Sequence, residues 1–206
     1  MQRLSLYIVG AQCTGKTTLI QALQRAFFLK YPSLHMRVIT EVARNVLQDY
    51  QFSRDDLTDN PERALELQQL ILVAQYKEES KSSTDSLLCD RSGVDPIVYA
   101  IKYGPPQARQ LLESASHWHY LRDRMRTSLV ILCQPHQEWL ADDGTRLMAK
   151  SWEEWESVHH IFVQVLETSG IGFWIIPEEL LDLEARVDFV LRLWNNLDSG
   201  SLSTRT

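Results

Sequence analysis

Eight residues near the amino terminus constrain the fold of this chain more than any other feature. Residues 10–17 read Gly-Ala-Gln-Cys-Thr-Gly-Lys-Thr and satisfy the pattern G-x-x-x-x-G-K-[ST] at every position. A short apolar run at 4–9 precedes them, and a helical stripe that begins near Lys16 follows. A strand, this loop and then a helix is the context in which the pattern forms a phosphate-binding loop, or P-loop. The alternative, a glycine-containing turn without a ligand, is disfavoured by the complete match in this context.

The residue types of the loop suit the phosphates of a nucleotide. Glycine at 10 and 15 lets the backbone wrap closely around a phosphate, so that loop amides and the helix N-terminus form a nest of donors. We expect Lys16 to reach the β- and γ-phosphates and Thr17 to ligate Mg²⁺. The expected phosphate-binding residues are Gly10, Ala11, Gln12, Cys13, Thr14, Gly15, Lys16, Thr17 and Thr18.

Strand-like and helix-like segments alternate along the rest of the chain. Apolar, β-leaning runs at 36–40, 86–90, 128–133 and 173–176 follow the first one at 4–9. Helical patterns separate them, including one that begins at Asn60-Pro61 and one whose Ser151 and Glu154 form a capping box. Strands that are apolar throughout and alternate with helices predict a parallel sheet covered on both faces. We therefore expect an α/β fold with three layers and a single P-loop domain over 1–198, followed by a flexible tail at 199–206.

Composition excludes several classes of protein. The 206 residues are 44% hydrophobic and 23% charged, which is ordinary for a globular domain, and the net charge of −6 disfavours general nucleic-acid binding. No apolar run approaches the roughly 18–20 residues of a membrane span. Three widely spaced cysteines suit a reducing compartment, so we expect a cytoplasmic protein.

Charged residues directly follow two of the expected strands. In an open parallel sheet, ligands bind beyond the carboxyl ends of the strands. Asp90 ends the run Leu-Leu-Cys-Asp and is placed to hold Mg²⁺ through water, while Arg91 is placed to bind a phosphate. The alternative for Asp90 and Arg91 is a salt bridge at the edge of the sheet.

Glu41 and Arg44 follow the second strand. A carboxylate there is suited to accept the proton of a substrate hydroxyl or to orient an attacking water, and the arginine is suited to clamp the substrate. The alternative is a carboxylate at a helix N-terminus paired with an arginine three residues later.

A third charged segment, Asp-Asp-Gly-Thr-Arg at 142–146, lies between the fourth strand and the capped helix. Mobile lids of phosphotransferases carry arginines that neutralise the transferred phosphoryl group, so we expect a lid over about 136–152. Arg146 is its best catalytic candidate, and Lys150 supplies a second cation. The alternative is an ordinary surface turn.

These motifs, taken in order, resemble those of the NadR-like AAA/ATPase domain family of P-loop NTPases, which includes nicotinamide-riboside-kinase-type domains. The matching segments are the P-loop, Glu41-Val42-Ala43-Arg44, the Asp-Arg-Ser-Gly-x-Asp-Pro run at 90–96, and Asp-Gly-Thr-Arg at 143–146. The resemblance spans about residues 3–195. It implies an ATP·Mg²⁺-dependent fold with the kinase-type strand order 2-3-1-4-5. It also implies a substrate cleft between Glu41, Arg44 and the lid, with Glu41 at the acceptor hydroxyl and Asp90-Arg91 near metal and phosphates.

Two functions remain open from the sequence, and a third, a nucleic-acid kinase or processing subunit, is disfavoured by the net charge of −6. The first is a small-molecule kinase that transfers the γ-phosphoryl group of ATP to a hydroxyl of a nucleoside-like acceptor. The second is an ATP- or GTP-hydrolysing switch that acts through a protein or lipid partner, since some members of the family look like GTP- and phosphoinositide-binding proteins. Asp90–Gly93 reads D-x-x-G as in GTPase switches, but no N-K-x-D motif for reading guanine occurs.

Overall fold

The computed structural model describes residues 4–53, 56, 58–81, 86–139 and 151–198. Its five strands are β1 (Leu6–Val9), β2 (Met36–Ile39), β3 (Ser86–Asp90), β4 (Leu129–Leu132) and β5 (Trp174–Ile175). Its helices are α1 (Lys16–Lys30), α2 (Val42–Asp49), α4 (Pro61–Ser80), α5 (Val94–Tyr103), α6 (Ala108–Glu113), α7 (Ser116–Met125), the 3₁₀ turn η1 (Gln137–Trp139), α8 (Trp152–Thr168) and α9 (Leu183–Asp198).

The strands form one parallel sheet in the order β2-β3-β1-β4-β5. The P-loop strand β1 lies in the middle, with Ile8 opposite Asp90 of β3 and Val9 opposite Leu132 of β4. This order and the parallel direction confirm the expected α/β P-loop architecture. In this order β3 lies between β2 and β1. The residues that follow β2 therefore start from the second strand away from the P-loop strand.

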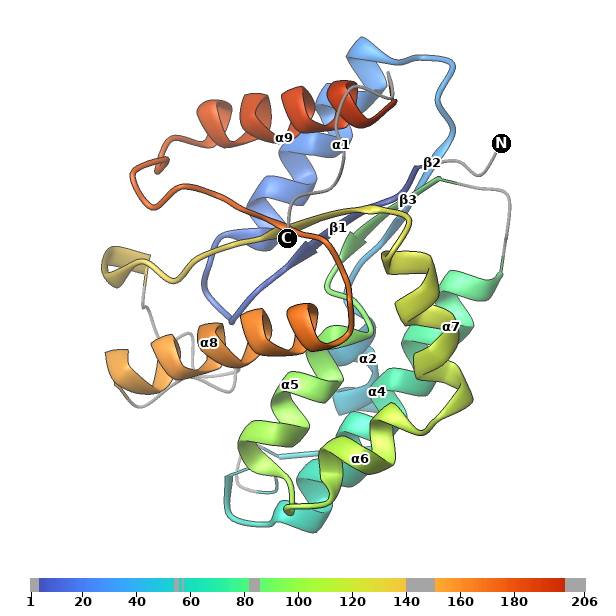
Figure 1. Cartoon of the computed structure of the whole chain (residues 1–206), viewed down its shortest axis with the longest axis vertical. Coiled ribbons are helices and arrows are strands. Elements are labelled where there is room, and N and C mark those ends of the chain that lie inside the picture. Colours follow the sequence, from blue (N-terminus) through green and yellow to red (C-terminus); the bar gives the residue numbers. More distant parts are fainter. Residues whose placement is uncertain (1–3, 54–55, 57, 82–85, 140–150, 199–206) are drawn as a thin grey trace.

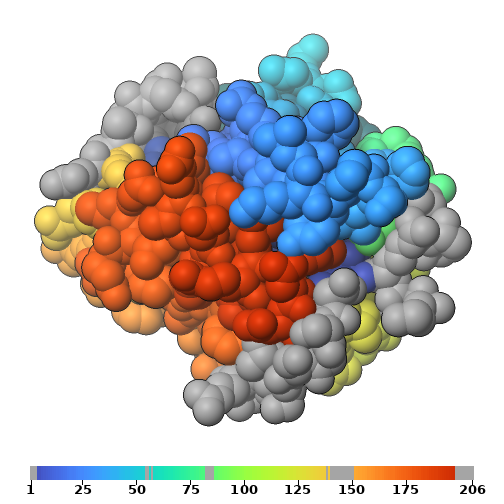
Figure 2. Space-filling model, turned by 90° about the horizontal axis from the view of Figure 1, so that it is seen from above, coloured from blue at the N-terminus to red at the C-terminus, as the bar shows by residue number. Residues whose placement is uncertain are grey.

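Helices cover both faces of the sheet, as Figure 1 shows. Alternate side chains of each strand point to opposite faces. Leu6 and Ile8 of β1 pack with α1 and α9 in one core, and Tyr7 and Val9 pack with the helices of the other face in a second core. Seen from above, α1 and α9 lie side by side over the first face (Figure 2). The P-loop therefore emerges between two packed layers, which fix its position.

Local sequence signals set the ends of two helices as expected. The Asn60 side chain accepts a hydrogen bond from the backbone N–H of Arg63, and Pro61 occupies the first turn of α4. The Ser151 hydroxyl accepts from the N–H of Glu154 at 3.3 Å and caps α8. These caps supply acceptors for amides that have no partner inside the helix.

Helices α6 and α7 occupy residues for which the sequence pattern predicts no element. Their signal is weak because α6 has only six residues. In α7 the buried positions Trp118, Leu121 and Met125 stand among histidines, arginines and an aspartate. Both helices pack against α4 and enlarge the helical layer on the α5 side of the sheet.

A carboxyl group is buried in this layer. Glu79 of α4 is fully buried, and it accepts hydrogen bonds from the Tyr7 hydroxyl at 2.5 Å and from Gln75 Nε2 at 2.9 Å. Arg124 Nε lies 3.9 Å from the same carboxylate. Burial raises the pKa of Glu79, and the hydrogen bonds and the neighbouring arginines offset this only in part.

This shift predicts that the chain loses stability as pH rises. The folded Glu79 holds its proton to a higher pH than the unfolded residue, whose ordinary pKa is 4.5, so the free energy of unfolding falls as pH rises above that value. One such group contributes a slope of at most about 1.4 kcal/mol per pH unit. We expect urea unfolding of Glu79→Gln between about pH 5 and 8 to have a flatter pH dependence than wild type. The exposed Glu66→Gln variant on the same helix should keep the wild-type slope, and equal slopes in all three proteins would contradict the assignment.

Candidate active site at the P-loop edge

Two glycines of the P-loop occupy positions at which a side chain would be strained. Gly10 has a φ of 135°, and a Cβ on it would lie 2.5 Å from the carbonyl oxygen of Cys133. Gly15 has a φ of 75°, and its Cβ would lie 2.7 Å from Nη1 of Arg186. The loop therefore wraps as tightly as the sequence pattern predicts, since only glycine adopts such backbone angles without strain in so little space.

Lys16 is folded back onto the loop. Its ammonium donates to the carbonyl oxygen of Ala11 and lies 3.3 Å from the Thr14 hydroxyl, which itself donates to Ala11 at 2.9 Å. Both Lys16 and Thr14 are buried. A nucleotide phosphate that enters the loop must replace these internal contacts as partners of the ammonium.

The pKa of Lys16 is lowered to about 8. Burial is the main cause, and the positive charge of Arg91 acts in the same direction, while Asp90 and Asp95 oppose both. The charged form of Lys16 is therefore marginal just above neutral pH as long as no anion occupies the loop.

We expect nucleotide affinity to fall as pH rises through about 8. A bound phosphate favours the ammonium, so binding above that pH must take up one proton, which weakens binding by up to about tenfold per pH unit. Calorimetry of ADP·Mg²⁺ binding at pH 7, 8 and 9, in buffers of different ionisation enthalpy, measures both quantities. An affinity that stays constant to pH 9 without proton uptake would contradict the role of Lys16.

Thr17 and Asp90 meet where β1 and β3 end. The Thr17 hydroxyl, in the first turn of α1, donates to a carboxylate oxygen of Asp90 at 2.7 Å. The parallel pairing of β1 and β3 brings these two residues together. The backbone N–H of Arg91 extends the pairing by one residue, because it donates a hydrogen bond to the carbonyl oxygen of Ile8. A hydroxyl and a carboxylate are the hard oxygen ligands that Mg²⁺ prefers, with water and phosphate oxygens completing its shell. Among the described residues, no group of three or more histidines, cysteines or carboxylates is placed to hold a metal.

Arg91 is held beside the P-loop by Asp95, which belongs to the Asp-Arg-Ser-Gly-x-Asp-Pro run at 90–96 but for which the sequence predicts no role of its own. Arg91 Nη1 lies 3.4 Å from the Asp95 carboxylate, which also accepts from the backbone N–H and the hydroxyl of Ser92. Burial raises the pKa of Asp95, while Arg91 and Lys16 counteract the shift. Burial alone would lower the pKa of Arg91, but Tyr99, Asp95 and Asp90 raise it above its ordinary value, so the guanidinium stays charged. The spacing Ser-x-x-Asp at 92–95 is the signal that could have identified Asp95, because it places both side chains at the start of α5.

Glu41 and Arg44 lie at the start of α2, directly after β2. Glu41 Oε2 and Arg44 Nη1 are 2.8 Å apart, and both side chains are partly exposed. This is the helix-start ion pair that the sequence left open as an alternative. Glu41 has a φ of 62°, and Arg91 has a φ of 81°, so the first residue after β3 and the second after β2 both adopt left-handed backbone angles. Strained non-glycine residues of this kind gather at functional sites.

The remaining expected site residues divide into two groups. Of the other loop residues, Ala11 and Gln12 are buried, Cys13 is partly exposed with a φ of 57°, and Thr18 is exposed on α1. Arg146 and Lys150, with most of the expected lid, lie outside the described residues, as does the expected tail at 199–206.

A family model described as an AAA domain matches residues 5–186. The chain belongs to this family. No curated protein sequence matches it closely enough to indicate a relationship. Among solved structures, the AAA-domain chain is similar to NadR in complex with NR, with a TM-score of 0.72 at 20% identity over 100% of this chain and 54% of that one. It is also similar to NadR in complex with NAD and AMP-PNP, with a TM-score of 0.68 at 18% identity over 100% of this chain and 52% of that one.

A third similar structure is deoxyadenosine kinase from M. mycoides, with a TM-score of 0.61 at 13% identity over 94% of this chain and 100% of that one. At these identities the likeness concerns the fold, which the AAA-domain chain shares with P-loop kinases and with NadR. The chain spans about half the length of the NadR chains that it matches.

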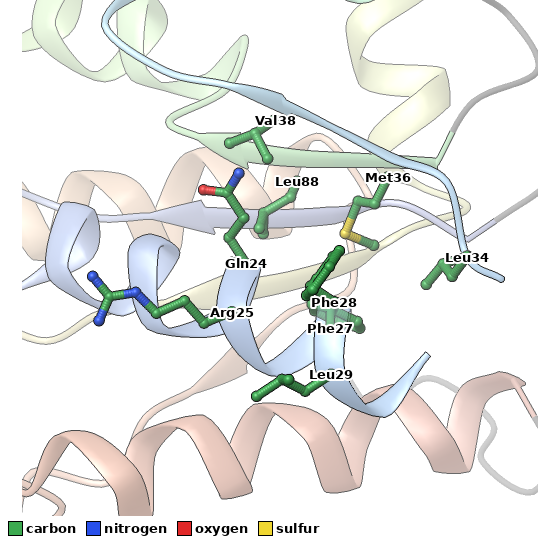
Figure 3. Close-up of a pocket in the computed structure, with 9 residues that line it drawn as sticks. All are labelled: Gln24, Arg25, Phe27, Phe28, Leu29, Leu34, Met36, Val38 and Leu88. Atoms are coloured by element: carbon green, nitrogen blue, oxygen red, sulfur yellow. The ribbon is translucent and has the colours of Figure 1, made fainter. Parts of the chain in front are cut away.

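An apolar cavity of about 510 Å³ lies apart from this site, between the second half of α1 and strand β2 (Figure 3). Its lining includes Phe28, Leu34 and Met36, and none of the described residues that line it carries a carboxylate or hydroxyl group. The lining residues of α1 begin at Gln24, eight residues and roughly 12 Å along the helix from Lys16. The cavity is therefore not part of the P-loop site. No helix among the described residues is long and apolar enough to cross a membrane.

Proposed function

We propose that this chain binds ATP·Mg²⁺ and transfers its γ-phosphoryl group to a hydroxyl of a small, nucleoside-like acceptor. The observation that carries the proposal is the grouping of Lys16, Thr17, Asp90 and Arg91 at the ends of β1 and β3. The fold shared with NadR structures that contain NR or AMP-PNP, and with a deoxyadenosine kinase, supports both the nucleotide and the class of acceptor.

In this proposal each charged group acts at a different point of the reaction. Lys16 and the loop amides bind the β- and γ-phosphates, and Arg91, held by Asp95, neutralises charge on the transferred group. Thr17 and Asp90 would hold Mg²⁺, which supplies charge neutralisation on the phosphate oxygens when it is bound. Glu41 accepts the proton of the acceptor hydroxyl. At the same time the hydroxyl oxygen bonds to the γ-phosphorus, and the bond between the γ-phosphorus and the ADP oxygen breaks. Arg146 is proposed as a lid arginine.

The acceptor class can be tested by coupled measurement of ADP release. Purified protein receives ATP·Mg²⁺ and one acceptor at a time, among them nicotinamide riboside and deoxyadenosine, with Lys16→Ala as the control. We expect ADP release that depends on one acceptor and disappears in the control. ADP release of the same rate with and without every acceptor would overturn the kinase proposal.

One observation favours the second function, a hydrolysing switch. Glu41 is already paired with Arg44 at 2.8 Å, so its carboxylate must leave or share this partner to serve as a base for an acceptor. In a switch, the pair would only start α2, and water would be the sole acceptor. A protein or lipid that accelerates acceptor-independent hydrolysis would favour that function.

A further inference from the structure

Two buried side chains from opposite faces of the sheet donate hydrogen bonds to backbone carbonyls of the P-loop. Trp155 of α8 donates through Nε1 to the carbonyl oxygen of Gln12 at 2.8 Å. Arg186 of α9 donates through Nη2 to the carbonyl oxygen of Thr14 at 3.1 Å. Trp155 is fully buried and Arg186 is 4% exposed. Neither residue belongs to the P-loop motif at 10–17.

Both side chains are themselves held in place. Trp155 packs against Trp152 with its ring edge-on, and α8 packs along α5. The Arg186 guanidinium lies 4.9 Å from the centre of the Trp139 ring, and α9 packs along α1. The donors are therefore fixed by the two helical layers, and the loop carbonyls are fixed by the donors.

Holding a carbonyl also sets the direction of the amide in the same peptide unit. All peptide bonds of the described residues are trans, and in a planar trans peptide the C=O and N–H point in opposite directions. The contact at Gln12 therefore turns the N–H of Cys13 away from Trp155, and the contact at Thr14 turns the N–H of Gly15 away from Arg186. Cys13 and Gly15 both have left-handed backbone angles, as in the anion-binding nests of other proteins. Among the described residues, none accepts a hydrogen bond from the Gly15 N–H.

We propose that Trp155 and Arg186 are positioning residues that aim the Cys13 and Gly15 amides at the phosphates of the bound nucleotide. The inference rests on the proposed binding of nucleotide, and it deepens that proposal by naming what holds the loop in its binding geometry. The two hydrogen bonds act separately, since that of Trp155 orients the Cys13 amide and that of Arg186 orients the Gly15 amide. Removing one of them should therefore affect one amide more than the other.

Binding measurements on three variants provide the first test. Trp155→Phe removes the indole donor, and Arg186→Met removes the guanidinium. Trp118→Phe makes the same change in a buried tryptophan of α7, away from the loop. We expect the first two variants to bind ADP·Mg²⁺ about tenfold to a hundredfold more weakly than wild type. This is the loss expected when one loop amide no longer donates a hydrogen bond to a charged phosphate. Tripolyphosphate, which has no base, should lose affinity by a similar factor, and Trp118→Phe should stay within about twofold of wild type.

Amide NMR separates a positioning role from a general loss of structure. Labelling with ¹⁵N-cysteine gives three amide signals and labelling with ¹⁵N-glycine gives eight, one for each residue of that type in the chain. In wild type, saturating ADP·Mg²⁺ should move the Cys13 and Gly15 protons downfield as they donate to phosphate. Trp155→Phe should reduce the shift of Cys13 more than that of Gly15, and Arg186→Met should do the reverse.

The outcomes distinguish the inference from the function on which it rests. If wild type binds nucleotide but the variants retain its affinity and its two amide shifts, or lose no more than Trp118→Phe, the inference is wrong and nucleotide binding stands. If wild type binds neither ADP·Mg²⁺ nor tripolyphosphate, both fail. If Trp155→Phe does not fold by thermal melting, 3-benzothienylalanine at position 155, which keeps the ring shape without the N–H, replaces it in the same comparison.

Discussion

Replacing Glu41 by glutamine is expected to slow phosphoryl transfer to the acceptor by about 10²–10⁴-fold, the usual contribution of a general base. Nucleotide affinity should stay within about twofold of wild type, because Glu41 follows β2, which β3 separates from the P-loop strand β1. Glutamine keeps the size of the side chain and a hydrogen-bond acceptor for Arg44, so the loss isolates the proton acceptor. Transfer rates and ATP·Mg²⁺ affinity measured on the same preparation give the two quantities.

Glu66→Gln is the matched control for this experiment. Glu66 forms an ion pair with Arg63, three residues away on α4, at 2.6 Å, so the substitution breaks a pair of the same kind outside the site. Exposed pairs like these contribute at most about 1 kcal/mol to stability, so both variants should fold. A Glu41→Gln enzyme that transfers at the wild-type rate would remove Glu41 from the mechanism and leave it as the partner of Arg44.

Replacing Asp90 by asparagine is expected to lower turnover by about 10²–10³-fold, a loss of several kcal/mol of charge stabilisation by the metal. Asparagine can still accept the hydrogen bond from the Thr17 hydroxyl, which is 2.7 Å from Asp90 in the native chain, so the loop should keep its shape. The carboxylate charge is lost, and the concentration of Mg²⁺ needed for half-maximal activity should rise. A titration of activity with Mg²⁺ at fixed ATP measures this change.

Binding of ADP without metal provides the internal comparison for Asp90→Asn. Because no cation separates Asp90 from the phosphates in that complex, removal of the negative charge should leave affinity unchanged or increase it. Asp188→Asn, which disrupts only an exposed pair with Lys30, should match wild type with and without Mg²⁺. An unchanged Mg²⁺ requirement in Asp90→Asn would contradict its assignment as a metal-site residue.

The sequence predicts the sheet and the P-loop because their signals are local. Strand β4 is apolar throughout, β3 is apolar between Ser86 and Asp90, and every residue of both strands is buried in the structure. Gly10 and Gly15 belong to a motif that places glycine where the backbone adopts positive φ angles, so the motif predicts the shape of the loop. Helix α7 is missed because Trp118, Leu121 and Met125 stand among polar residues, so the buried stripe covers only part of the helix.

The surroundings of the loop are harder to predict because their contacts join distant parts of the chain. Trp155 is 143 residues from Gln12, and Arg186 is 172 residues from Thr14. Neither pair has a spacing that identifies it, and both depend on how α8 and α9 pack onto the sheet. Asp95 differs, since its spacing from Ser92 is a local signal that predicts a helix start but not the contact with Arg91.

The fate of the γ-phosphoryl group tests the central claim most directly. The protein is incubated with ATP labelled with ¹⁸O in the γ-phosphoryl group, Mg²⁺ and the acceptor that gives the fastest ADP release, and the products are identified by mass spectrometry. The proposed function predicts an acceptor monophosphate that carries the label, formed in equal amount to ADP and absent with Lys16→Ala. Labelled inorganic phosphate in equal amount to ADP, with no phosphorylated acceptor, would contradict it and identify a hydrolase.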